Sequence, residues 1–185
     1  MAGRLSWGLG DQAVSSLTNF VVGIYVAREL GVIAFGVFSL AWVTYGVVLN
    51  VSRGLATDPL MVRFSAVATE DWRGAVARTS GTALAVGVLA GVLSVLIGIA
   101  LGGALSSAFI GLGIVLPALL LQDSWRFAFF ASGEGHRAFL NDMVWAAALV
   151  PAMFFAAKHG SVIGFVLAWG ASAALAACFG YVQTG

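Results

Sequence analysis

Charge is scarce in this sequence of 185 residues: only 9% of them are Asp, Glu, Lys or Arg, whereas a soluble domain usually carries about 25%. Hydrophobic residues make up 61%, and the mean hydropathy is +1.00. A soluble domain of this size buries only about 70% of its surface on folding, so it could not hide so much apolar area. These values exclude a cytosolic enzyme, a secreted disulfide module and a disordered regulator. They predict a chain that lies in a bilayer.

Other features are missing as well. The single cysteine, Cys178, cannot form an intramolecular disulfide, and a net charge of +1 gives no attraction for nucleic acid. There is no HExxH, glycine-rich phosphate loop, CxxC or metal cluster in the sequence, so we expect no cofactor and no enzymatic activity. No Asp, Glu or His lies near the middle of an apolar stretch, and we therefore expect no deep proton relay.

The apolar residues fall into stretches that are long enough to span a membrane. A transmembrane helix needs about 20 mostly apolar residues, and six stretches qualify: about 12–30, 35–55, 80–101, 107–127, 140–157 and 161–181. Asp11 and Gln12 at the start of the first stretch exclude a cleavable signal peptide. The sequence predicts an all-α, polytopic integral membrane protein, in which residues 1–185 form one bundle of six transmembrane helices.

The basic residues predict the orientation of this bundle. A cytoplasmic N-terminus places seven arginines at inner ends and loops: Arg4, Arg53, Arg63, Arg73, Arg78, Arg126 and Arg137. Only Arg28 and Lys158 then lie outside. Because basic residues accumulate on the cytoplasmic side, both termini are predicted to be cytoplasmic, as an even number of helices requires.

The longest connection, about 56–79, has a pattern of its own. Asp58-Pro59 is typical of a helix cap followed by proline at the first helical position. From Pro59 to Glu70, an interfacial helix would place Leu60, Phe64 and Val67 on one side. A solvated loop is the alternative interpretation.

Helical periodicity predicts a polar face on the first span, since residues three, four and seven apart share a face. That face consists of Gln12, Ser15, Ser16 and Asn19, with Asp11 and Thr18 on its flank. Such groups avoid lipid tails, so they either line a wet cavity or bond neighbouring helices.

The second span separates its two faces more clearly. One face carries Ser39, Trp42, Tyr45, Gly46, Asn50 and Arg53, and the other is nearly all aliphatic. Arg53 ends the polar face near the inner surface, where it either snorkels to lipid headgroups or offers its planar fork of donors to a phosphate. On a straight helix Arg28 points away from the polar face of the first span, so a cavity role for it requires a bend or a helix end.

Small residues and prolines suggest how the remaining helices pack. The third span has Gly87, Gly91, Gly98 and Gly102 at a spacing typical of close helix contact. Pro117 and Pro151 lie inside the fourth and fifth spans and predict kinks there.

The turn between the fourth and fifth spans is predicted to be cytoplasmic. It holds Gln122, Asp123, Trp125, Arg126, Glu134, His136, Arg137 and Asp142. Asp123 and Arg126 are one helical turn apart, and a local ion pair is the simplest interpretation.

Three segments of this sequence are similar to one family. The segment from Trp7 to Trp42, with Asp11-Gln12 and Ala27-Arg28-Glu29-Leu30-Gly31, resembles the first two helices of polysaccharide flippases. These are the O-antigen and capsule exporters of the multidrug/oligosaccharidyl-lipid/polysaccharide superfamily. The segments SRGLATDPLMVRF and LQDSWRFAFFASGEGHRAFLNDMVW resemble the same family at its second inner loop and at its fourth-to-fifth helix turn.

The resemblance implies a function. Members have about twelve to fourteen helices in two bundles and move undecaprenyl-diphosphate-linked sugars across the bacterial inner membrane by alternating access. Six helices would supply only the N-terminal bundle, so a truncated product or gene fragment, or a half-size protomer that dimerises, is expected.

The resemblance also implies residue roles and partners. Arg53 would attract the diphosphate, Tyr45 and Trp42 would stack on sugar or linker, and Asn19 and Ser16 would bond hydroxyls. The cavity set is completed by the remaining polar residues of the two spans: Asn50, Ser15, Gln12, Asp11 and Arg28. Expected partners are the lipid-linked glycan, the bilayer, a second helical bundle, and glycan polymerases or glycosyltransferases.

Two other functions are weighed against this one. The first is a drug or cation antiporter of the same superfamily, which would be expected to carry a carboxylate deep in the bundle. The second is a membrane subunit that does not transport and that anchors enzymes of glycan assembly.

Overall fold

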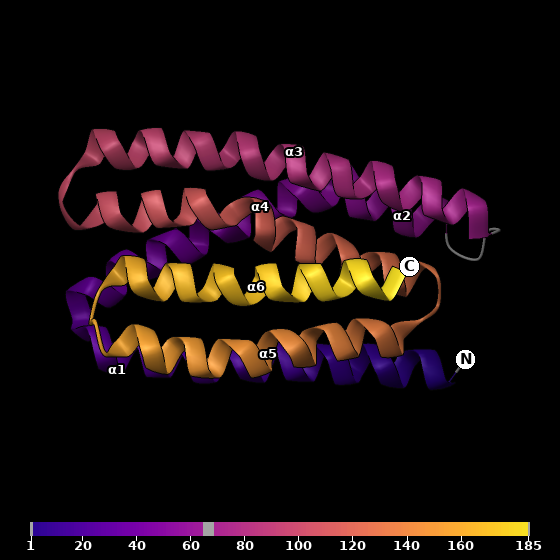
Figure 1. Cartoon of the computed structure of the whole chain (residues 1–185), viewed down its shortest axis with the longest axis horizontal. Helices are drawn as coiled ribbons and strands as arrows, with labels where there is room; N and C mark the ends of the chain where they lie inside the picture. Colours follow the sequence, from indigo (N-terminus) through magenta and orange to yellow (C-terminus); the bar gives the residue numbers. More distant parts are fainter. Residues whose placement is uncertain (1, 65–68, 185) are drawn as a thin grey trace.

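The computed structural model describes residues 2–64 and 69–184, which are helical and contain no strand. In chain order the helices are α1 (Ala2–Ser52), a π-helical turn η1 (Arg53–Thr57), α2 (Asp58–Arg63), α3 (Thr69–Leu101), α4 (Gly103–Ala131), α5 (Gly135–Ala157) and α6 (Val162–Thr184). Figure 1 shows the long helices stacked side by side as one bundle. The all-α prediction is confirmed.

Within the described residues, five helical segments are long and apolar enough to cross a membrane. They are α1 with its continuation through α2, and then α3, α4, α5 and α6. This is the pattern of a multi-pass membrane protein.

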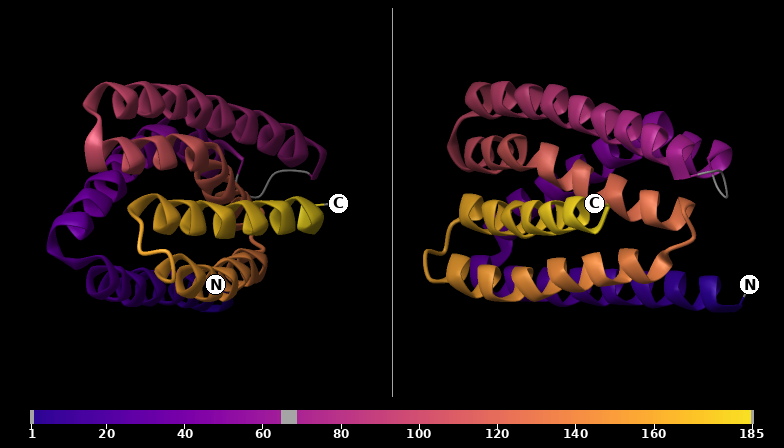
Figure 2. Two further views of the ribbon diagram at one scale, coloured as in Figure 1. Left: turned by 60° about the vertical axis from the view of Figure 1, so that its left-hand side comes forward. Right: turned by 45° about the vertical axis from the view of Figure 1, so that its right-hand side comes forward.

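The first two predicted spans lie in one continuous helical segment that changes direction at Gly31. Gly31 has φ 72° and ψ 174°, the non-helical geometry inside α1, and a residue with a side chain rarely adopts this φ. Figures 1 and 2 show α1 running along α5, turning, and returning toward the end of the bundle where it began. The expected pair of separate helices is therefore one segment with two arms, before and after Gly31. That the chain crosses the membrane six times stays a prediction.

The segment after α1 differs from its prediction. Asp58 does not cap a new helix, because the helical backbone continues from Ser52 through η1 into α2, whose N-cap residue is Thr57. Leu60 is buried against Trp72 and Ala75 of α3. Helix α2 ends at Arg63, so the predicted interfacial helix is shortened to one that packs on the bundle; Val67 lies outside the described residues.

Helices α3 and α4 approach each other as closely as their glycines allow. A Cβ on Gly91 would lie 2.5 Å from the carbonyl oxygen of Gly113, and one on Gly87 would lie 2.7 Å from Cα of Pro117. The predicted small-residue contact is therefore confirmed for these glycines. Gly102 does not belong to the contact, because its φ of 67° places it in the turn between α3 and α4.

The end of the bundle at which the chain starts is also where it finishes. Figure 1 shows the first residues of α1 and the last residues of α6 at one end, with the turn between α3 and α4 at the other. This arrangement is the one that the predicted even number of passes would give. Which side of the membrane that end faces stays a prediction.

Replacing Gly91 with alanine should destabilise the bundle by about 2 kcal/mol, because the added methyl group forces two backbones apart. The matched control is Gly81→Ala in the same helix, where a Cβ would meet nothing within 4 Å; the higher helix propensity of alanine should leave that variant unchanged or slightly more stable. Thermal unfolding in detergent measures both. Equal melting temperatures for the two variants would contradict the close contact.

Reporter fusions test the predicted orientation. A reporter inserted at the turn after Leu101 should report the periplasmic side, and one fused after residue 184 should report the cytoplasm, because these positions lie at opposite ends of the bundle. The same side for both would contradict the even number of crossings.

Candidate functional site

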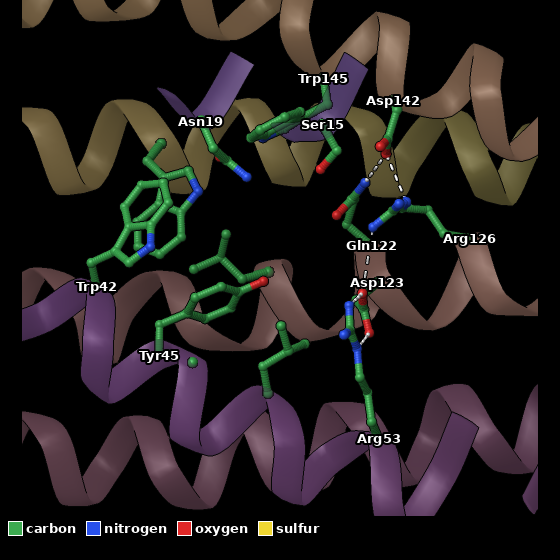
Figure 3. Close-up of a pocket in the computed structure, with 14 residues that line it drawn as sticks. Ser15, Asn19, Trp42, Tyr45, Arg53, Gln122, Asp123, Arg126, Asp142 and Trp145 are labelled. Carbon is green, nitrogen blue, oxygen red and sulfur yellow. Dashed lines mark hydrogen bonds and ion pairs between the residues drawn. The ribbon is translucent and has the colours of Figure 1, made fainter. Parts of the chain in front are cut away.

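A cavity of about 250 Å³ opens inside the bundle, where the two arms of α1 face α4, α5 and α6. Figure 3 shows polar and charged groups at one end of it and aromatic rings at the other. Its lining residues are Ser15, Asn19, Trp42, Tyr45, Gly46, Leu49, Arg53, Leu119, Gln122, Asp123, Arg126, Asp142, Trp145 and Trp169.

Arg53 is fixed in the cavity wall by a two-point bond to α4. Its Nε donates to Oδ2 of Asp123 at 3.0 Å and its Nη2 donates to Oδ1 at 2.6 Å. Its guanidinium also lies over the ring of Phe127, 5.0 Å from the ring centroid, within the range of a cation–π contact. These contacts hold the guanidinium against the cavity wall, while 31% of the side chain stays exposed. Arg53 begins the π-helical turn η1, a local geometry that is frequent at functional sites.

Arg126 joins three helices. Its Nη2 donates to Oδ2 of Asp11 in α1 at 2.5 Å, and its Nε forms an ion pair with Oδ1 of Asp142 in α5 at 2.8 Å. The predicted local pair with Asp123 exists, but at 3.7 Å it is the longest of the three contacts. Arg126 therefore acts mainly as a bridge between helices that are far apart in the sequence.

Amide groups extend this network to α6. Nε2 of Gln122 donates to Oδ1 of Asp142 at 3.1 Å and to Oδ1 of Asn141 at 3.3 Å. Nδ2 of Asn141 then donates to the backbone carbonyl of Ala176 at 2.7 Å. The buried polar groups thus connect α4, α5 and α6.

Aromatic rings form the opposite end of the cavity. Trp42 stacks on Trp169 with ring centroids 4.7 Å apart and an interplanar angle of 13°. Tyr45 meets the same indole edge-on at 4.7 Å. Flat apolar surfaces beside hydrogen-bonding groups suit a ligand that has both apolar faces and polar edges, such as a sugar ring.

The structure brings together five of the predicted residues: Ser15, Asn19, Trp42, Tyr45 and Arg53 line the cavity. Asp11 is buried behind it, on Arg126.

The other four predicted residues do not line this cavity. Gln12 and Ser16 are exposed, and Nε2 of Gln12 donates a hydrogen bond to Oγ of Ser16 at 3.1 Å. Asn50 is exposed as well, and its side-chain amide donates to the backbone carbonyl of Gly46. Arg28 is exposed, three residues before the reversal at Gly31. These four side chains stay outside this cavity, because each is exposed on the outward side of its arm of α1.

Sequence reasoning missed the contribution of α4, α5 and α6. It assigned Gln122, Asp123, Arg126 and Asp142 to a cytoplasmic turn, but the chain leaves helical geometry only around residues 132–134. The first three lie in α4 and the fourth in α5, and Asp123 and Asp142 are buried. The expectation that this chain holds no buried carboxylate inside the bundle is corrected. A signal was present, since Leu119, Gln122 and Arg126 follow the spacing of one helical face.

No protein-family model, curated protein or solved structure matches this chain. A proposal for its function therefore rests on the geometry of the cavity.

Removing the bridging guanidinium should cost stability. In Arg126→Met, Asp11 and Asp142 lose their shared cation while buried, a situation that typically costs about 3–5 kcal/mol. The melting temperature in detergent should fall well below that of Arg28→Met, where the replaced arginine is exposed. Equal melting temperatures for the two variants would show that the bridge contributes nothing.

Proposed function

We propose that this chain is one bundle of a transporter that moves lipid-linked oligosaccharide or polysaccharide precursors across the bacterial inner membrane. What supports the proposal above all is the cavity, in which charged and aromatic side chains are enclosed by a bundle with an apolar exterior. Polar groups inside membrane bundles are costly and commonly mark a substrate path. Sites of this kind in transporters lie between helical units that rock about a central point, which is the basis of alternating access.

The cavity offers a different group to each part of a glycan diphosphate. The faces of Trp42 and Tyr45 would stack on sugar rings, and Asn19 and Ser15 would exchange hydrogen bonds with hydroxyls. Arg53 would turn from Asp123 to a phosphate oxygen and form charge-assisted bonds there. Its partial exposure makes it the arginine that a substrate reaches first.

A partner bundle completes the proposal. Gln12, Ser16 and Asn50 are polar and exposed on α1, where lipid tails offer them no hydrogen bonds. A second helical bundle, from a downstream product or from another copy of this chain, would cover them and close the cavity. Glycan polymerases or glycosyltransferases would supply or consume its substrate.

One observation favours a second candidate, export of a drug or another organic cation. The charged network contains three carboxylates against two guanidiniums, and it adjoins an aromatic wall of the kind that binds cations. The antiporter alternative was disfavoured because no buried carboxylate was expected, and that objection no longer holds. The two candidates differ in the charge of the ligand.

Binding measurements separate the two candidates. We expect native mass spectrometry of the detergent-solubilised chain to show retention of undecaprenyl diphosphate in preference to undecaprenol, because only the diphosphate engages Arg53. Arg53→Ala should weaken binding by about 10- to 100-fold, the value of a charge-assisted hydrogen bond, and Arg53→Lys should weaken it less. Arg63→Ala, ten residues on and exposed, is the matched control.

Binding of an organic cation instead of the diphosphate would contradict the proposal. Retention of tetraphenylphosphonium but not of undecaprenyl diphosphate would favour the organic-cation exporter. Diphosphate binding that is unchanged in Arg53→Ala would remove Arg53 from the site.

A further inference from the structure

The charged network in the cavity wall contains one more acidic group than basic groups. It consists of Asp11, Arg53, Asp123, Arg126 and Asp142. The remaining ion pair among the described residues, Arg137 with Glu134, stands apart from it. With all five groups ionised, three carboxylates face two guanidiniums, which leaves a net charge of −1.

The excess charge is buried. The side chains of Asp11, Asp123 and Asp142 are 3%, 5% and 1% exposed, and that of Arg126 is 12% exposed. An uncompensated charge in such surroundings costs several kcal/mol even after relaxation. A neutralising group is therefore expected at this place.

The contacts identify which carboxylate is compensated least. Asp123 accepts two hydrogen bonds from Arg53, and Asp11 accepts one from Arg126. Asp142 accepts its hydrogen bond from the neutral amide of Gln122, and its contact with Arg126 is an ion pair without hydrogen-bond geometry. Asp142 Oδ2 and Asp11 Oδ1 are both buried without a hydrogen-bond partner.

The surroundings of Asp142 favour a proton over a metal ion. Arg126, Gln122 and Asp123 face it from α4, Asp11 faces it from α1, and Tyr45 shares the cavity wall with it. The described residues contain no group of three or more His, Cys, Asp or Glu side chains able to hold a metal ion. A proton needs only one carboxylate oxygen, and it occupies no volume in a packed interior.

We propose that Asp142 binds one exchangeable proton, so that the network of five residues is neutral in the folded protein. The proton comes from water, forms an O–H bond at a carboxyl oxygen of Asp142, and returns to water when it leaves. The protonated carboxyl group can donate a hydrogen bond to a neighbouring carboxylate oxygen. Such a bond would satisfy the buried oxygens of Asp11 and Asp142 that otherwise have no partner. The site does not depend on which molecule the chain transports.

Infrared difference spectroscopy tests this site directly. At neutral pH the wild-type protein in detergent should show the C=O band of a protonated carboxyl group, shifted by deuterium exchange and lost at alkaline pH. The band should be absent in Asp142→Asn, which mimics the protonated form in shape, and present in Asp142→Glu. It should persist in the control Asp58→Asn, where the carboxyl group is exposed.

Thermal unfolding gives a second measurement that does not require the band. As the pH rises from about 4, the melting temperature of the wild type should fall by several degrees until the folded protein also releases this proton, because over that range the folded protein holds a proton that the unfolded chain has already lost. Asp142→Asn should lack most of this fall.

Three results would overturn the proposal. They are a wild type without the band, a band that survives in Asp142→Asn, and stabilisation by sodium chloride but not by choline chloride, which would identify a metal cation instead.

Discussion

The contact on which this structure depends is the one between the guanidinium of Arg126 and the carboxylates of two other helices. It joins Asp11, near the start of the chain, to Asp142 in α5. Hydrophobic burial does little to hold helices together in a bilayer, since lipid tails are as apolar as leucine. Charges that cannot be satisfied by lipid therefore hold the first arm of α1, α4 and α5 in one arrangement, and they set the position of the cavity wall.

Helix α4 organises the bundle in two different ways. Toward α3 it presents Gly113 and Pro117, and the two backbones come into close contact. Toward α1 and α5 it presents Gln122, Asp123 and Arg126, which bond across helices. Close backbone packing holds the side toward α3, and ion pairs and hydrogen bonds hold the side toward α1 and α5. A substitution on one side should therefore leave the contacts on the other intact.

The sequence was sufficient for the helices and for part of the cavity. Long apolar stretches have few alternatives to helices in a membrane, and the spacing of Trp42, Tyr45 and Arg53 identified the inward side of the second arm of α1. Helical spacing grouped Asn50 with Gly46 and Arg53, but its side chain is exposed outside the cavity. The side of the helix that faces the cavity includes Leu49, and the next residue along the helix points about 100° away from it. Gln12 and Ser16 are likewise exposed, whereas Asp11 is buried and Ser15 lines the cavity.

The charged network could not be predicted in the same way. The sequence interpretation assigned Asp123, Arg126 and Asp142 to the cytoplasmic turn between two spans, because charged side chains are costly among lipid tails. The partner that removes this cost for Arg126 is Asp11, 115 residues earlier, and no local pattern connects the two. The reversal at Gly31, by contrast, falls between the first two predicted spans, and the positive φ of this single glycine is sufficient to turn the chain there.

The placement of opposite charges on α1 and α4 also bears on how the chain is inserted during synthesis. Helices leave the ribosome in chain order, so α4 reaches the membrane carrying Asp123 and Arg126 before α5 exists. An arginine or aspartate at the centre of a lone inserting helix costs about 2.5–3.5 kcal/mol. Asp11 in α1 and Arg53 at the start of η1 precede α4 in the chain, and they offer a counter-charge to each of the two groups that arrive. The counter-charges for α4 thus come from segments that are synthesised before it, whereas Asp142 comes from a helix that is synthesised after it.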